Sequence, residues 1–140
     1  VIGSAMSGGV KNVHAHDCKI SGTMQGIRLK SMRGRGGYID GAVFENIEIS
    51  GVSDQAVQIN MFYEFSTVVP KSTVPSECRN IVIKNVHGSG AKTGIMINGL
   101  PEKKLKNIVL ENVDLTAREA IVCKNAENVT MKNVILSENG

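Results

Sequence analysis

Leu105-Lys106-Asn107-Ile108-Val109-Leu110-Glu111-Asn112-Val113 follows a nine-position template: apolar, charged, Asn, apolar, any, apolar, any, Asn, apolar. Four more copies of this template span residues 10–18, 39–47, 78–86 and 126–134. Asn or its near-isostere Asp fills the second polar column in all five copies, and Asn fills the first in four. Such self-similarity indicates a repeat architecture in which equivalent positions stack in columns.

Each copy alternates apolar and polar residues and is rich in β-branched side chains. This alternation is typical of strands and not of helices. The first four copies are each followed, after a polar turn, by a second short alternating segment, at residues 26–30, 56–60, 94–98 and 120–124. We therefore expect an all-β protein in which each repeat contributes a long strand and a short one.

The spacing between copies varies, which is typical of a solenoid whose insertions fall in loops. Stacked coils would place the apolar columns inside. They would also bring the amides of Asn12, Asn80, Asn107 and Asn128 above one another at a bend, about 4.8 Å apart. A β-sandwich also uses short strands but predicts no columns of identical Asn. The sequence therefore predicts a parallel β-helix of about five coils.

Composition fits a single globular domain. The chain has 140 residues, 41% of them hydrophobic, and a net charge of +3, which permits an acidic partner without demanding nucleic acid. No apolar run reaches the ~18–20 residues of a membrane span, so no membrane partner is expected, and no signal peptide is recognisable at the start. We expect one β-helix domain over residues 1–140, interrupted by an inserted loop at 61–78.

The opening residues Val1 and Ile2 resemble the middle of an element, which predicts a fragment truncated at its N-terminal end. An open β-helix end would expose unpaired strand edges and an uncapped core. Self-association through that end is therefore expected.

Cysteine and histidine give little evidence of chemistry. Cys18, Cys78 and Cys123 all fall in apolar columns, so we expect small core residues and not a redox or metal site. His14 and His16 could share a metal ion, but no third ligand has suitable spacing.

Cations gather in one strand and in the glycine-rich turn after it, Gly26 to Gly37. If Ile27 and Leu29 are buried, Arg28 and Lys30 project together from the outer face, about 6–7 Å apart. Such a strand and loop could hold a carboxylate or a phosphate. The alternative is a solvated basic edge. An aromatic side chain from the 61–78 loop, Phe62 or Phe65 among them, could stack on a sugar ring there.

Four motifs together resemble the C-terminal half of glycoside hydrolase family 28, the polygalacturonase family: residues 3–4, residues 6–10, the strand 26–30 and the turn Arg33-Gly34-Arg35-Gly36-Gly37. Ala5 departs from the Glu that often follows Gly-Ser in that family. The resemblance implies a right-handed, single-stranded parallel β-helix and inverting hydrolysis of galacturonate-containing polysaccharide (pectin), without metal or other cofactor. It implies that Arg28 and Lys30 bind a substrate carboxylate. Arg33 follows in the same loop, and Gln55 stands where some members place a substrate-contacting Tyr.

The family's catalytic Asp residues and its Gly-His-Gly histidine lie upstream of Gly3-Ser4, so no catalytic residue is expected in this chain. Inverting hydrolysis needs two carboxyl groups about 6.5–9.5 Å apart. Asp54 and Glu64, the nearest substitutes, fall in different loops. We therefore expect the substrate-binding half of a secreted or periplasmic hydrolase, whose partners are the acidic polysaccharide and a missing N-terminal portion.

Two other functions are compatible with the sequence. A non-catalytic β-helical carbohydrate-binding or adhesion module would show the same strands and columns. An RNA-binding tract would explain Arg-Gly-Arg-Gly-Gly, but the chain has only one copy of it and little net charge.

Overall fold

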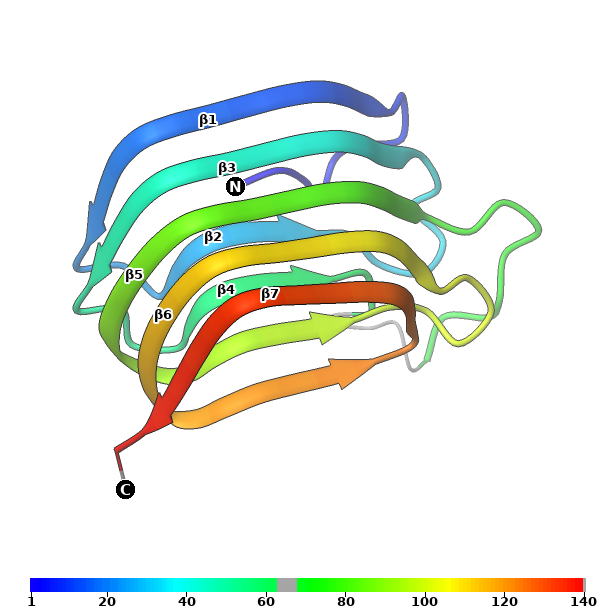
Figure 1. The fold of residues 1–140 in the computed structure, drawn as a ribbon. Helices are drawn as coiled ribbons and strands as arrows, with labels where there is room; N and C mark the ends of the chain where they lie inside the picture. The colour runs from blue at the N-terminus through cyan, green and yellow to red at the C-terminus, as the bar shows by residue number, and fades with distance from the viewer. Residues whose placement is uncertain (63–67, 140) are drawn as a thin grey trace.

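The computed structural model describes residues 1–62 and 68–139. Strands are the only regular elements there, so this part of the chain has no helix that could cross a membrane. Figure 1 shows the strands winding into successive coils. They are β1 (Val10–Ser21), β2 (Gln25–Lys30), β3 (Tyr38–Ser50), β4 (Gln55–Asn60), β5 (Glu77–Asn98), β6 (Leu105–Lys124) and β7 (Ala126–Glu138).

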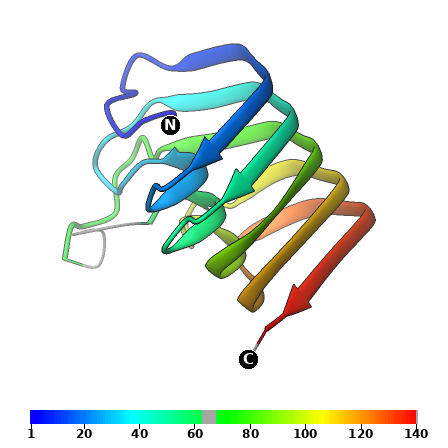
Figure 2. The ribbon, with the colours of Figure 1, turned by 90° about the vertical axis from the view of Figure 1, so that its left-hand side faces the viewer.

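All strand pairings are parallel, and they form two tracks. The long track runs β1, β3, β5, β6, β7, and the short track runs β2, β4 and then the second halves of β5 and β6. Seen from the side, each coil stacks directly on the next (Figure 2). The fold is a right-handed parallel β-helix, which confirms the prediction from the columns and from the resemblance.

The sequence predicts separate long and short strands in each of the first four repeats, and the third and fourth repeats differ from this. β5 and β6 each run continuously through the expected turn. Their pairing adjusts there by a register shift between Ser89 and Ala91. An extra residue at a bulge bends a strand without ending it. One bent strand therefore pairs in both the long and the short track.

Two columns of Asn residues form the bends. Their members take the left-handed backbone conformation, with φ between 53° and 59°, which Asn tolerates better than most residues. In the first column, Asn107 donates to Asn80 at 3.1 Å and Asn128 donates to Asn107, as predicted. Asn12 occupies the predicted bend but does not join the ladder, because Gly41 stands between it and Asn80 and has no side-chain amide.

The second column forms a more complete ladder. Each amide donates to the oxygen one coil earlier, at distances of 2.7 to 3.4 Å, and the first member is a carboxylate that only accepts. The members are Asp17, Asn46, Asn85, Asn112 and Asn133. Both ladders tie neighbouring coils together on the outside of the bends.

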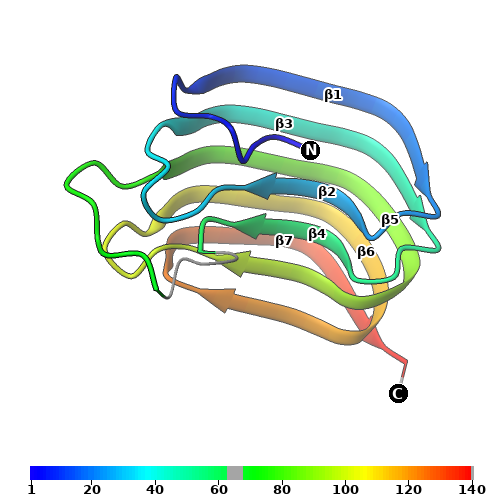
Figure 3. The same cartoon turned by 180° about the vertical axis from the view of Figure 1, so that it is seen from behind.

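Apolar columns fill the interior between the two tracks. Leu29, Ile59 and Ile97 stack in one such column and are fully buried. Cys78 is buried as expected, and Cys18 is half-buried. Cys123 follows Ile97 in its column but is exposed, so the prediction of a core residue is wrong there. It lies on the last short-track strand, and no further described strand packs beyond it (Figure 3).

Candidate functional site

The outer face of β2 carries the two predicted cations. Ile27 and Leu29 are buried, while Arg28 and Lys30 between and after them are partly exposed. This confirms the alternation expected from the sequence. Because β2 pairs in register with β4, Arg28 lies beside Gln58. The strand therefore presents two cations on one face of the solenoid, above a row of amides.

A directed chain of hydrogen bonds runs from Arg28 to a carboxylate. Arg28 Nε donates to Gln58 Oε1 at 2.6 Å, and Gln58 Nε2 donates to Gln55 Oε1 at 3.0 Å. Gln55 Nε2 then donates to Asp54 Oδ1 at 2.8 Å. Each donor in such a chain polarises the next, and the arrangement fixes the orientation of the guanidinium at its head.

Gln25 closes this chain into a network. Its Oε1 accepts from Arg28 Nη1, and its Nε2 lies 3.4 Å from acceptor oxygens of both Gln55 and Asp54. Gln55 is only 6% exposed, and its amide and carbonyl are both occupied by these partners. Gln55 is therefore buried and bonds to Gln58, the residue that accepts from Arg28.

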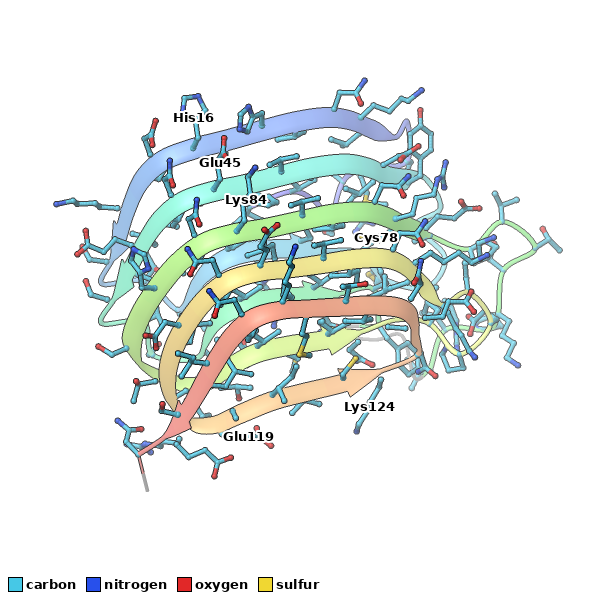
Figure 4. The ribbon with its side chains drawn as sticks, viewed as in Figure 1. His16, Glu45, Cys78, Lys84, Glu119 and Lys124 are labelled. Carbon is cyan, nitrogen blue, oxygen red and sulfur yellow. The ribbon has the colours of Figure 1, made fainter. Side chains whose placement is uncertain are left out.

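Lys30 begins a polar column that crosses the short track. The next members are Asn60, Asn98 and Lys124, and Asn98 Nδ2 donates to Asn60 Oδ1 at 3.2 Å. Asn60 Oδ1 also accepts from the backbone N–H of Phe62. The two amides therefore hold the start of the 61–78 segment against the strands. Figure 4 shows Lys124 at the far end of this column.

Arg33 lies in an ion pair between loops. Its Nε and Nη2 donate to the two carboxylate oxygens of Glu102 at 2.6 and 2.9 Å, and its Nη1 donates to the Val69 carbonyl. The guanidinium also lies 4.8 Å from the centre of the Phe62 ring. The bond from Arg33 lowers the pKa of Glu102. Arg33 thus joins the loop after β2 to two later loops.

The carboxyl groups provide no clear acid–base pair among the described residues. Those whose pKa departs clearly from its ordinary value are Asp17, Glu45 and Glu102, and all three are lowered by hydrogen bonds from basic or amide partners. A general acid needs the opposite shift. Asp54 accepts bonds from amides, and Glu64 lies outside the described residues, as does Phe65.

The two histidines are occupied by carboxylates on the far side of the coils. His14 Nε2 lies 2.7 Å from Glu45 Oε1, and His16 Nδ1 lies 2.8 Å from Asp17 Oδ2. Glu45 also pairs with Lys84 of the next coil at 3.2 Å (Figure 4). The described residues contain no group of three or more His, Cys, Asp or Glu side chains arranged to hold a metal ion.

Sequence reasoning missed three members of this region: Gln25, Gln58 and Glu102. The register of the repeats already places Gln58 beside Arg28, so its role was accessible from the columns. Gln25 lies one residue before the predicted strand 26–30. Glu102 lies 69 residues from Arg33 in an irregular turn, and no periodicity points to it.

Comparisons with known proteins identify the family of this chain. The model of the glycosyl hydrolases family 28 matches residues 1–135. An endo-polygalacturonase of Pectobacterium carotovorum subsp. carotovorum is 32% identical over 124 residues, which are 89% of this chain and 29% of that protein. A polygalacturonase of Penicillium griseoroseum is 29% identical over 96 residues, 67% of this chain and 25% of that protein.

A solved structure of a polygalacturonase is also similar to this chain in fold. The hyperthermoactive exopolygalacturonase from Thermotoga maritima superimposes with a TM-score of 0.80 at 27% sequence identity. The match covers 94% of this chain and 30% of that one. The chain therefore spans between a quarter and about a third of the length of these relatives.

Proposed function

This chain belongs to the glycosyl hydrolases family 28, and on that basis we propose that it forms the substrate-binding part of a pectin-degrading, polygalacturonase-type glycosidase. Its ligand is a galacturonate-containing polysaccharide, and it works as one β-helix domain with residues 61–78 as an inserted loop. The observation that carries the proposal is the outer face of β2, where Arg28 and Lys30 stand together and Arg28 is held by Gln58 and Gln25.

A guanidinium suits this substrate because its planar donors match the geometry of a carboxylate. The Gln58–Gln55–Asp54 chain fixes the Arg28 guanidinium before the ligand arrives, so little orientational freedom is lost on binding. Lys30 adds a second positive charge on the same face. Gln55, predicted as a substrate contact, would act through Gln58 on the position of Arg28.

Arg33, also predicted as a substrate contact, would have a different role in this proposal. Its bidentate pair with Glu102 would hold the loop after β2 next to the binding face. A guanidinium whose donors are engaged in this way serves better as a fixed link between loops than as a ligand for an incoming carboxylate.

Hydrolysis with inversion would use a general acid and a general base on either side of the scissile bond. We propose that these carboxyl groups lie outside this chain, in an N-terminal portion of the same protein. The downward pKa shifts of Asp17, Glu45 and Glu102 support this, because none of the three suits a proton donor. A polymeric plant substrate also implies a secreted or periplasmic protein.

Isothermal titration with trigalacturonate tests the proposal, with released reducing sugar assayed in the same samples. We expect the wild-type chain to bind without hydrolysis and Arg28→Ala to lose most of the affinity. Arg118→Ala, an exposed arginine of β6, is the matched control and should bind like wild type. Binding unaffected by Arg28→Ala would refute the assignment of the site, and hydrolysis by this chain alone would refute the separation of chemistry from binding.

A further inference from the structure

A pocket of about 450 Å³ opens beside the loop that follows β2. It starts two residues beyond Lys30, so it adjoins the face described above. Two arginines line it, and the described residues of its lining include no acidic side chain. The lining residues are Ser7, Met32, Arg33, Gly34, Arg35 and Val69.

The two arginines of this pocket differ in their partners. Arg33 is paired with Glu102, and both side chains are close to 10% exposed. Arg35 is exposed, and its guanidinium contacts only the Met32 sulfur, at 3.9 Å, among the described residues. Lys71 also lies near enough to Glu102 to help lower the pKa of that carboxyl group. Glu102 is therefore acted on by Arg33 and Lys71, and the charged side chains among the described residues that line the pocket are both arginines.

Hydrogen bonds to its backbone hold the Arg35 loop in place. Ser7 Oγ donates to the Arg35 carbonyl at 2.8 Å, and the Arg35 N–H donates to the Met32 carbonyl at 3.2 Å. Ser76 Oγ, fully buried, lies 2.9 Å from the Gly36 carbonyl and 3.0 Å from Ser31 Oγ. The loop is thus fixed at both ends.

Contact between Gly34 and Val69 shapes one wall of the pocket. Gly34 has a φ of +87°, and a Cβ added there would lie 3.2 Å from Val69 Cγ1. The positive φ favours glycine at this position, and a Cβ there would also crowd the Val69 side chain. The pocket therefore has a fixed wall, and the guanidinium of Arg35 is its adaptable cationic group.

We propose that this pocket binds a second carboxylate of the same acidic oligosaccharide, with Arg35 as its ligand. The inference rests on the proposed function. A polymer of uronic acid carries a carboxylate on every sugar, so a neighbour of the sugar held by Arg28 and Lys30 presents one to an adjoining cationic pocket. Arg35 then distinguishes an oligomer from a single acidic sugar.

The test is titration of trigalacturonate into wild type, Arg35→Gln, Arg35→Lys and Arg118→Gln. Loss of a charge-assisted contact at an exposed site should weaken binding by Arg35→Gln about tenfold. Arg35→Lys keeps the charge without the planar fork and should fall between that variant and wild type. Arg118→Gln changes the net charge equally, outside the pocket, and should bind like wild type.

The outcomes separate this inference from the proposed function. Equal affinities for Arg35→Gln and Arg118→Gln, with binding still lost in Arg28→Ala, would overturn the second carboxylate site and leave the proposed function intact. Failure of the wild-type chain to bind trigalacturonate would overturn both. An Arg35→Gln defect as large for galacturonate monomer as for the trimer would overturn the distinction between oligomer and single sugar.

Discussion

Substitution of Asn85 separates the two contributions that an Asn ladder makes to this fold. Asn85 sits in the middle of the second ladder with a φ of 53°. Its Nδ2 donates to Asn46 at 3.2 Å, and its Oδ1 accepts from Asn112 at 2.7 Å. Asn85→Gly removes both side-chain bonds but suits the backbone conformation. Asn85→Ala removes the same bonds. Unlike the glycine variant, it keeps a Cβ in the left-handed region, where no side-chain amide now offsets the cost.

The magnitudes follow from these geometries. Two partly solvated hydrogen bonds contribute about 1–2 kcal/mol together, so Asn85→Gly should lower the free energy of unfolding by about that amount. A non-glycine residue in the left-handed conformation costs about 1 kcal/mol more. Asn85→Ala should therefore be less stable than wild type by about 2–3 kcal/mol, and less stable than Asn85→Gly by about 1 kcal/mol.

Urea denaturation followed by circular dichroism measures these differences, provided that the slope of the transition is unchanged. Ser89→Ala, an exposed position on the same strand, is the control and should stay within about 0.5 kcal/mol of wild type. If Asn85→Ala proved as stable as Asn85→Gly, the left-handed backbone conformation would carry no energetic penalty for a residue with a Cβ. If both matched wild type, the ladder would contribute nothing to stability.

Three further predictions concern ion pairs and thiols. Glu102→Gln leaves its guanidinium partner uncompensated in a site that is 10% exposed, and should lower the free energy of unfolding by about 2 kcal/mol in urea titration; no loss would show the pair to be solvent-screened. Burial raises the pKa of Cys78 to about 12 and also raises the pKa of Cys123, but only Cys123 is exposed. Iodoacetamide at pH 8 should therefore label Cys123 faster than Cys78 in the folded protein, and equal labelling would contradict the burial of Cys78. The hydrogen bond to Asp17 raises the pKa of His16 above 6.5, so this contact stabilises the fold below that pH and is lost as pH rises through the raised pKa. His16→Gln should remove this part of the pH dependence of the urea midpoint, and identical pH profiles would refute it.

The fold was predictable because the repeat constrains the whole chain at once. A parallel solenoid places equivalent residues above one another, so the recurrence of Asn80, Asn107 and Asn128 in one column is enough to indicate a shared bend. Burial at the end of the stack was harder to predict from the sequence. Cys123 follows the apolar pattern of Ile97, but its exposure depends on what packs beyond it, which a column alone does not specify.

The candidate site was predictable only where it follows the repeat. Arg28 and Lys30 face outward because their neighbours on β2 face inward, and this alternation is visible in the sequence. The partner of Arg33 was not predictable in this way. Glu102 approaches it from an irregular turn two coils away, and loop-to-loop contacts carry no period.

The same stacking that defines the core also limits the extent of the polar network. In the column that begins with Arg28, the next side chain is Gln58, but the two after it are Met96 and Val122. Besides its bond to Gln55 within the same strand, Gln58 Nε2 meets, among the described residues, only the weakly accepting Met96 sulfur, at 3.8 Å, on the next coil. The chain of strong donors and acceptors along this column therefore ends at the second coil of the short track. Substitutions on β6 should therefore leave the orientation of Arg28 unchanged. This is the physical reason that Arg118 serves as a control for both binding experiments.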